Sequence, residues 1–263
     1  MSESNAQERD YYTVSEILKL LSLSKANFFR KVANGELPRA MKHGQYSKAD
    51  YDTLARAQKA VFTYFDRMMF SRSTIAEQEQ EMFIGIRCFG MEFITPLAER
   101  IAFQQKAEFT FWSLKVLGKV VGYVSMFRFP DAFLDDLLTG RKIEREITLK
   151  EVLPFTRLEP FFVYIDVMAV DPTLPPHERA VYAGIIVERF ANKILDLRAN
   201  GYLIEKLYTV TATPEGDILV QKVGFQRMEG KSLVPGRIAY QFPLDEQGVQ
   251  RLWKLTRREV QHE

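Results

Sequence analysis

One carboxylate of this chain stands inside an apolar segment, where it could take part in acid–base chemistry. Residues 161–170 are Phe-Phe-Val-Tyr-Ile-Asp-Val-Met-Ala-Val, a run typical of a strand buried on both faces. If the side chain of Asp166 faces a cleft, it could remove a proton from a bound ligand as a general base. The alternative is a carboxylate that pairs with a neighbouring strand or is simply exposed.

The segment after this run should place a helix N-terminus beside the strand end. Pro175-Pro176 exclude helix from the loop, because proline is tolerated only in the first helical turn. From His177 to Ala199 the apolar residues recur with a helical period, as they do in an amphipathic helix. Free N–H groups and the helix dipole at such an end favour an anion. Many α/β proteins contain this unit without a ligand, so both interpretations stay open.

Bulk composition narrows the class of protein. With 263 residues, 46% of them hydrophobic and 27% charged, the chain is typical of one or two ordinary globular domains. The single Cys88 excludes an intramolecular disulfide, and His43, His177 and His262 give no metal-ligand cluster. No apolar run approaches membrane-spanning length, and residues 1–10 lack a signal-peptide core. We therefore expect a cytoplasmic protein without a metal and without a membrane partner.

The N-terminal quarter carries the signals of short helices joined by tight turns. Thr13 and Glu16 form a capping box for a first helix. Ser24 then caps a second helix over residues 25–34. The signals that follow are Gly35 as a helix terminator, a hairpin over residues 39–46 and a Ser47 cap for a third helix.

This order of elements resembles the MerR-type, excisionase-like winged helix-turn-helix domain. The resemblance covers about residues 10–56 and rests on Tyr12-Thr-Val-Ser-Glu16, Leu23-Ser24, Phe29-Arg30 and Asn34-Gly-Glu-Leu-Pro38. It implies that the second helix enters the major groove of double-stranded DNA and that the hairpin is a wing on the backbone or minor groove. The DNA-binding residues implied are Lys25, Asn27, Arg30 and Lys31 on the helix, and Arg39, Lys42 and His43 on the wing.

The distribution of charge agrees with this implication. Between Tyr11 and Arg56 there are eight Lys or Arg against four Asp or Glu, a local charge of about +4 in a chain whose net charge is +2. A surface that faces phosphates requires such an excess. The alternative is a solvated helical face in a protein–protein module.

A wide apolar stripe follows this first domain. Its residues run from Leu54 to Met69 on a helix expected over residues 51–70, and such a surface is too apolar to stay in water. We expect the stripe to pair with a second copy in a homodimer, or to dock within its own chain. Residues 71–80 are polar and should hold the boundary, which gives domains over residues 1–75 and 76–263.

The second domain should contain a mixed β-sheet. Strands are expected over residues 83–89, 109–117, 119–129, 161–170, 207–212 and 237–242, and helices over 96–107, 177–199, 217–223 and 247–261. An insertion at 130–160 should hold two further helices, over 131–138 and 149–155. This order, with Met168-Ala-Val-Asp-Pro172 and Lys222-Val-Gly-Phe225, resembles the GNAT acyl-CoA N-acyltransferase fold over about residues 80–243. The fold class expected is thus mixed α+β, a small winged helix followed by a GNAT-like sheet flanked by helices.

The resemblance implies an acyl-CoA site at the N-terminus of the long helix, near Val170, Arg179, Ala180 and Val181. Two features depart from the family's pattern there. Tyr182 stands where the family has a small residue, and Glu178 adds a negative charge where a pyrophosphate should bind. The family's proton-donating Tyr is replaced by Val220, and its Asn by Thr213.

These departures decide the main interpretation. We expect a DNA-binding regulator whose GNAT-like domain is non-catalytic and serves dimerisation, scaffolding, ligand sensing or a protein partner. No cofactor is then expected, and acetyl-CoA should bind weakly or not at all. The alternative is an active acyl-CoA-dependent N-acyltransferase, targeted by its helix-turn-helix domain, with Asp166 as the catalytic residue and acetyl-CoA or another acyl-CoA as its co-substrate.

Overall fold

The chain divides into two compact units. The computed structural model describes residues 9–21, 23–65, 68–230 and 232–256. Within these ranges, the smaller unit comprises residues up to 65 and the larger one residues from 68 onward. The boundary between the units thus lies between residues 65 and 68, somewhat before the one expected at 75/76. No helix in the described ranges is long and apolar enough to cross a bilayer.

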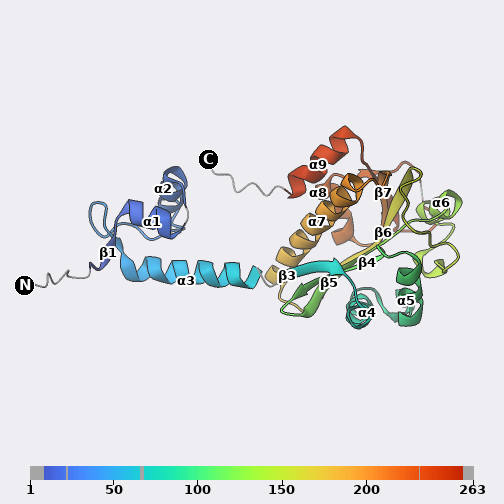
Figure 1. The fold of residues 1–263 in the computed structure, drawn as a ribbon, viewed down its shortest axis with the longest axis horizontal. Coiled ribbons are helices and arrows are strands. Elements are labelled where there is room, and N and C mark those ends of the chain that lie inside the picture. The colour runs from blue at the N-terminus through green and yellow to red at the C-terminus, as the bar shows by residue number, and fades with distance from the viewer. Residues whose placement is uncertain (1–8, 22, 66–67, 231, 257–263) are drawn as a thin grey trace, which may run out of the picture. The chain divides into compact units, whose positions relative to one another are not determined.

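The described residues of the smaller unit form three helices and a two-stranded ribbon (Figure 1). Its elements are β1 (Tyr11–Tyr12), α1 (Val14–Leu20), α2 (Lys25–Ala33), β2 (Tyr46–Ser47) and α3 (Lys48–Phe65). The capping box expected at the start of α1 is present, because the Thr13 side chain accepts from the N–H of Glu16 and the Glu16 carboxylate accepts from the N–H of Thr13. Ser24 caps α2 in the expected way. A small core around the buried Ile17, Phe28 and Tyr51 holds these elements together.

The expected apolar stripe is not a single helical face. Helix α3 ends at Phe65, and Met68 and Met69 belong to β3 (Met68–Arg72), which pairs with the sheet of the larger unit. The helix expected as far as Phe70 was therefore wrong at its C-terminal end, because strand pairing outweighs the helical period there. The side chains of residues 58–67 lie outside the described ones, so the homodimer stays a prediction.

The larger unit is built on a seven-stranded mixed sheet, with strand order β3-β4-β5-β6-β7-β9-β8. The remaining strands are β4 (Phe111–Val116), β5 (Lys119–Phe127), β6 (Phe161–Val170), β7 (Ile204–Thr211), β8 (Gln226–Arg227) and β9 (Ile238–Pro243). All pairs are antiparallel except β6 with β7, which is parallel. The mixed sheet expected for this part of the chain is confirmed.

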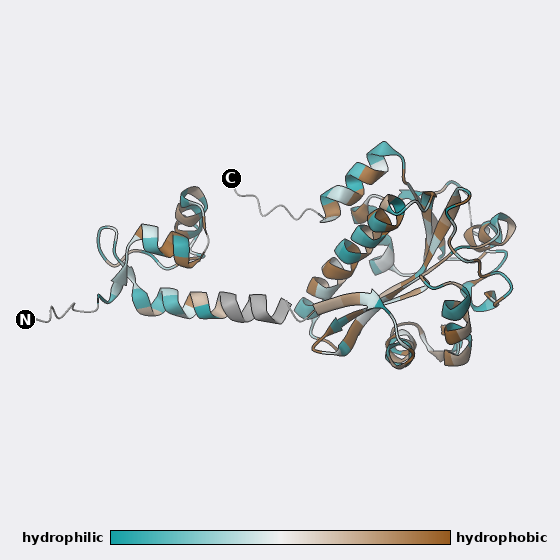
Figure 2. Cartoon of the chain, in the orientation of Figure 1, coloured by the Kyte–Doolittle hydropathy of each residue, from teal (hydrophilic) through white to brown (hydrophobic). Residues whose placement is uncertain are grey.

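Helices cover both faces of this sheet (Figure 1). One face carries α7 (Pro176–Ala199), α8 (Pro214–Val223) and α9 (Glu246–Thr256), and the other α4 (Ile75–Phe89), α5 (Leu97–Lys106) and α6 (Asp131–Thr139). Two short 3₁₀ turns, η1 (Met91–Phe93) and η2 (Glu144–Glu146), follow α4 and α6. The strands are largely apolar and the helices are polar on their outer sides (Figure 2), as burial on both faces of the sheet requires.

Three expectations for this unit were wrong. Residues 83–89 form the last turns of α4 rather than a strand. Residues 71–80 are not a polar linker, because they complete β3 and begin α4. Residues 149–155 form turns and one β-bridge, between Arg128 and Leu153, where a helix was expected. Helix α9 ends at Thr256 in the described range, and Arg257 and Arg258 of the expected basic helix lie outside it.

The parallel pair β6–β7 opens toward its carboxyl end. Its ladder stops at Ile165 opposite Thr209, although β6 continues to Val170 and β7 to Thr211. On the other side of β6 the register with β5 shifts between Ser125 and Met126. Asp166 is the unpaired residue of this bulge. Bulges re-aim side chains, so the opening and the bulge together determine where Asp166 lies.

Candidate active site

A cavity of about 580 Å³ runs through the sheet where β6 and β7 part. On the face of α7 it is apolar, and its walls come from α7, α8 and α9. On the opposite face its walls come from α4, η1, η2 and the segment before β9. Two ligand groups could thus meet from opposite faces of the sheet. Pockets of this size and mostly apolar lining are typical of small-molecule sites.

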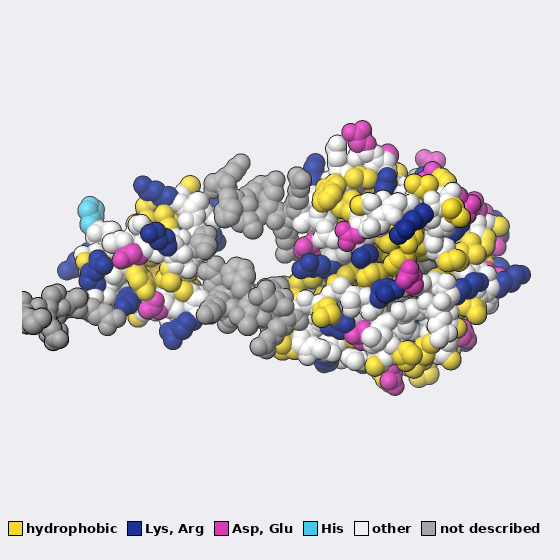
Figure 3. All heavy atoms as spheres, in the orientation of Figure 1, with side chains coloured by type: hydrophobic (Ala, Val, Ile, Leu, Met, Phe, Trp, Pro, Cys, Tyr) yellow, Lys and Arg dark blue, Asp and Glu magenta, His cyan; other side chains and the backbone are white. Residues whose placement is uncertain are grey.

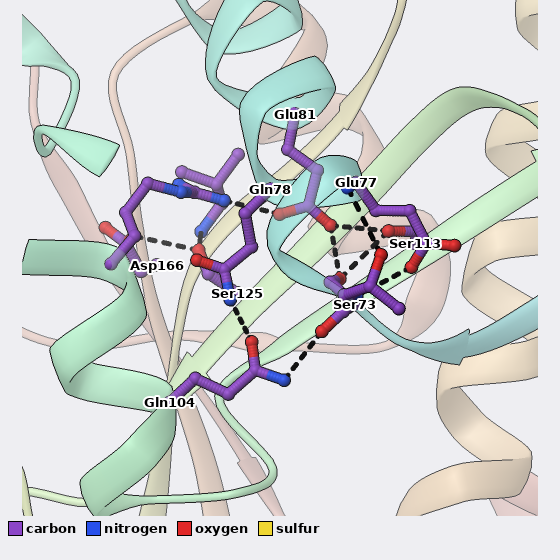
Figure 4. Close-up of polar contacts among 11 residues, drawn as sticks. Ser73, Glu77, Gln78, Glu81, Gln104, Ser113, Ser125 and Asp166 are labelled. Atoms are coloured by element: carbon purple, nitrogen blue, oxygen red, sulfur yellow. Dashed lines mark hydrogen bonds and ion pairs between the residues drawn. The ribbon is translucent and has the colours of Figure 1, made fainter. Parts of the chain in front are cut away.

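Asp166 lines this cavity. Its carboxylate accepts a hydrogen bond of 2.8 Å from Oγ of Ser125, and the same Ser125 oxygen accepts from the N–H of Val167 at 3.1 Å (Figure 4). Burial, with the charge of Glu144 as a smaller cause, raises the pKa of Asp166 to about 7. A carboxyl group with a pKa near 7 is suited to accept a proton at neutral pH.

A half-buried ion pair lies on the same side of the cavity. Nη2 of Arg237 is 2.6 Å from Oε1 of Glu144, and Tyr164 also donates to that oxygen. Burial alone would raise the pKa of Glu144, but the hydrogen bond and charge of Arg237 outweigh it and lower that pKa. Glu144 is therefore ionised and its charge is matched by Arg237. Asp166 remains the carboxyl group of the cavity lining that is available for proton transfer.

The turn between β6 and α7 is held by Asp171. Its carboxylate accepts from the N–H of Thr173 and from Nη2 of Arg87, both at 3.0 Å. Although burial opposes ionisation, these bonds lower the pKa of Asp171. The turn leads to Pro175 and Pro176, which have no N–H groups, so His177 and Glu178 supply the first donors of α7. Among the described residues no acceptor is present for either N–H group.

The residues predicted to bind an acyl-CoA lie at this turn and not in the cavity. Arg179, Ala180 and Val181 are exposed in the first turns of α7, and Val170 is the half-buried last residue of β6. Tyr182, expected to obstruct the site, is buried in the core between α7 and the sheet. That expectation was wrong, because residue 182 faces the sheet and not the turn. Glu178 is half-buried in the first turn, as expected.

The replacements for the family's other residues have ordinary structural surroundings. Val220 lines the cavity with an apolar side chain, and Thr213 caps α8 by accepting from the N–H of Gly216 at 3.1 Å. Tyr164 and Tyr208 could serve as acids by residue type, but both are buried and outside the cavity lining. Burial also raises the pKa of Tyr164 well above its usual value.

Three charged residues of the cavity lining, Glu144, Arg145 and Arg237, were not predicted from the sequence, and neither was Ser125, which donates to Asp166. Glu144 and Arg237 are 93 positions apart, and no spacing rule brings them together. Glu144 and Arg145 also lie in the segment interpreted as an insertion. For Ser125, the sequence does contain a signal: side chains alternate between the two faces along a strand, and this alternation along β5 places Ser125 on one face of the sheet.

The predicted DNA-binding residues are at the surface of the smaller unit. Lys25, Arg30, Arg39, Lys42 and His43 are exposed, and Asn27 and Lys31 are half-buried. Lys31 forms an ion pair of 2.6 Å with Glu36, and Arg30 donates to the Asn27 side chain at 2.9 Å. Figure 3 shows many Lys and Arg side chains on the visible face of this unit.

No family model matches the chain, and no curated protein matches it either. Several solved structures resemble it. Ard1 from Thermoplasma volcanium is 13% identical, over 66% of this chain and 95% of its own, with a TM-score of 0.45. An acetyltransferase of the GNAT family from Bacillus cereus is 12% identical, over 67% and 96%, with a TM-score of 0.39. The polyamine N-acetyltransferase of Drosophila melanogaster is 14% identical, over 67% and 100%, with a TM-score of 0.43. At these TM-scores the function has to be argued from the chain's own cavity.

Proposed function

We propose that the larger unit is an acyl-CoA-dependent N-acyltransferase in which Asp166 is the general base. The observation that carries the proposal is the cavity through the opening of β6 and β7, with a carboxyl group of pKa about 7 in its wall. A carboxylate of this kind accepts the proton that an amine must lose before it attacks. The non-catalytic interpretation depended partly on Tyr182, and the burial of that side chain in the core removes this objection.

The residues present fit an acyl-CoA. The N–H groups of His177 and Glu178 and the exposed Arg179 offer donors and positive charge to a pyrophosphate. The apolar half of the cavity, between α7, α8 and α9, fits an uncharged arm and acyl chain. The thioester would supply an activated acyl group. An ammonium acceptor would lose one proton to Asp166 before it attacks, the bond of the acyl group to sulfur would be replaced by one to nitrogen, and a second proton of the nitrogen would pass to the departing sulfur. Val220 has no proton to give to that sulfur.

Titration of the full-length protein with acetyl-CoA by calorimetry tests this proposal. We expect binding in the micromolar range, weakened by the carboxylate of Glu178 beside the donors of α7. Glu178→Gln should then tighten binding several-fold, because like charges about 4 Å apart repel by a few kcal/mol at an effective dielectric constant near 20 and by less at a hydrated surface.

The matched control is Glu188→Gln, a half-buried glutamate further along the same helix. It should leave the affinity unchanged. Absence of acetyl-CoA binding in both the wild type and Glu178→Gln would contradict the proposal and favour the non-catalytic interpretation.

A second function is proposed for the smaller unit, which is binding to double-stranded DNA. It is favoured by the exposure of Lys25, Arg30, Arg39 and Lys42, cations that are free to meet phosphates. Lys31 contributes less than expected, because Glu36 already neutralises it. The two functions are compatible, since each is argued from residues of one unit alone.

A further inference from the structure

The wall of the cavity on the α4 face shows which amine the proposed transferase would accept. This side carries the apolar side chains of Phe89 in α4, Phe93 in η1, Ile94 directly after η1 and Ile143 directly before η2. Phe89 and Phe93 are 38% and 57% exposed, so aromatic rings stand at the entrance. Such a surface favours an acceptor with an apolar side chain, which gains from leaving water.

The charges on this side favour an anionic group on the acceptor. Arg145 lies in the lining, is exposed and forms no ion pair with any described residue. The charge of Glu144 is already matched by Arg237, and Asp166 takes the amine's own proton. A second ammonium group on the acceptor would find no free carboxylate in the described lining and would be repelled by Arg145.

Arg237 adds an independent observation. Its Nε–H group is buried and has no hydrogen-bond partner among the described residues. Arg237 lines both this cavity and a second, more polar one of about 390 Å³, and Val234 and Pro235 are also shared. An unsatisfied buried guanidinium N–H is costly unless a ligand supplies an acceptor. A carboxylate is the acceptor that a guanidinium binds best.

We infer that the acceptor is an α-amino acid with an apolar side chain. This inference rests on the proposed acyltransferase function and adds the class of its substrate. The amino group gives up its proton to Asp166, the side chain packs against Phe89, Phe93 and Ile143, and the carboxylate is bound by Arg145 and by Nε of Arg237. Polyamines and other multiply charged cations are excluded by the same arginines.

Two pairs of amines that differ only in the carboxylate test this inference. Full-length protein with acetyl-CoA is supplied with phenylalanine or 2-phenylethylamine, and with leucine or 3-methylbutylamine, and the released thiol is measured. We expect kcat/KM for each amino acid to exceed that for its decarboxylated partner by about tenfold or more, as a charged hydrogen bond allows. Putrescine should be the poorest acceptor.

Arg145→Gln separates carboxylate recognition from a general loss of structure. It should raise KM for phenylalanine about tenfold and leave KM for 2-phenylethylamine unchanged, and Arg145→Lys should restore part of the loss. The control is Lys150→Gln, an exposed cation nearby that does not line the cavity, and it should change neither KM.

The outcomes distinguish this inference from the proposed function. Equal use of each amino acid and its decarboxylated partner, or a preference for putrescine, overturns the inference and leaves the acyltransferase standing. Acetyl-CoA binding without transfer to any of these five amines also overturns it. Failure to bind acetyl-CoA at all overturns the proposed acyltransferase function itself.

Discussion

At the scale of single residues, the ionisation of Asp166 should set the pH dependence of the reaction. The charges that act on this carboxyl group come from Glu144, Arg100 and Arg237, and burial raises its pKa to about 7. Because only the carboxylate accepts a proton, log kcat/KM should rise with slope one below pH 7 and level off above it. The Asp166→Asn variant should show no such rise of log kcat/KM below pH 7, and its kcat should be lower by about 10²-fold or more.

A stability measurement on the same variant checks the pKa independently of catalysis. The unfolded carboxyl titrates near pH 4 and the folded one near 7, so between these values unfolding releases a proton. Stability of the wild type should therefore fall with rising pH in this window, by up to about 1.4 kcal/mol per unit from this group. The difference between wild type and Asp166→Asn should follow that slope. A flat difference would mean that Asp166 is already ionised at pH 5.

The sequence predicts Asp166 but not its partners. A carboxylate within an apolar strand is unusual, and the position of Asp166 in such a run therefore indicated a functional or structural role. The Ser125 bond and the Glu144–Arg237 pair depend on contacts between distant segments, which no local pattern encodes. Tyr182 shows a different error, in which a side chain was predicted at the site although it lies in the core. Alignment to a motif could not show the direction of this side chain.

At the scale of elements, α4 and α5 are fixed to the sheet by a buried polar cluster. Glu81 on α4 accepts from Ser73, Ser113 and Arg100, the last on α5 (Figure 4). The side chains of Glu81 and Arg100 are 0% and 4% exposed. Since α4 also carries Phe89 at the cavity entrance, this cluster positions part of the candidate site.

Breaking the cluster from one side should destabilise the larger unit strongly. Glu81→Gln leaves the guanidinium of Arg100 buried without its counter-charge, which costs about 3–5 kcal/mol. The double variant Glu81→Leu/Arg100→Met should recover much of this loss, because it leaves no buried charge unpaired. Urea unfolding followed by tryptophan fluorescence measures both, since Trp112 and Trp253, the two tryptophans of the chain, belong to this unit.

Arg72→Ala is the matched control. Arg72 pairs with Glu108 at the surface, where the two side chains are 52% and 58% exposed, and its removal should have a far smaller effect. If Glu81→Gln proved as mild as Arg72→Ala, the cluster would not be what fixes α4 to the sheet.

The error over α4 has a physical explanation. Phe-Ile-Gly-Ile-Arg-Cys-Phe at 83–89 has the composition of a strand, but the capping box of Thr74 and Glu77 starts a helix that continues through it. That box could have been recognised from the sequence. The close approach of Gly85 to the Tyr123 hydroxyl, where a Cβ atom would lie 2.7 Å away, could not, because it depends on how α4 packs on β5.

At the scale of the whole molecule, the chain combines two units whose proposed ligands differ. The larger unit offers a cavity for small molecules, and the smaller one offers exposed cations. The order of elements predicted the mixed sheet and the starts of the three N-terminal helices, because caps, turns and periodicity are local. The through-sheet cavity could not be predicted, since it depends on where the β6–β7 ladder stops.

DNA binding by the full-length protein should depend on cations of α2. Lys25 and Arg30 are exposed on this helix, whereas Lys31 is neutralised by Glu36, so the informative variant is Lys25→Ala/Arg30→Ala. Each lost phosphate contact reduces the slope of log K against log salt by about 0.9. The double variant should therefore bind duplex DNA more weakly at low salt, with a slope smaller by about two, as measured by fluorescence anisotropy at several salt concentrations.

The control for this measurement is Lys119→Ala/Lys150→Ala, which removes two exposed cations from the larger unit. It lowers the net charge of the chain by the same amount, so a general electrostatic attraction would be weakened equally by both variants. If α2 is the binding surface, only the α2 variant loses affinity. Equal losses of affinity in the two variants would show that DNA binds the chain through general electrostatic attraction and not at a defined surface. Unchanged DNA binding by the α2 variant would contradict the function proposed for the smaller unit.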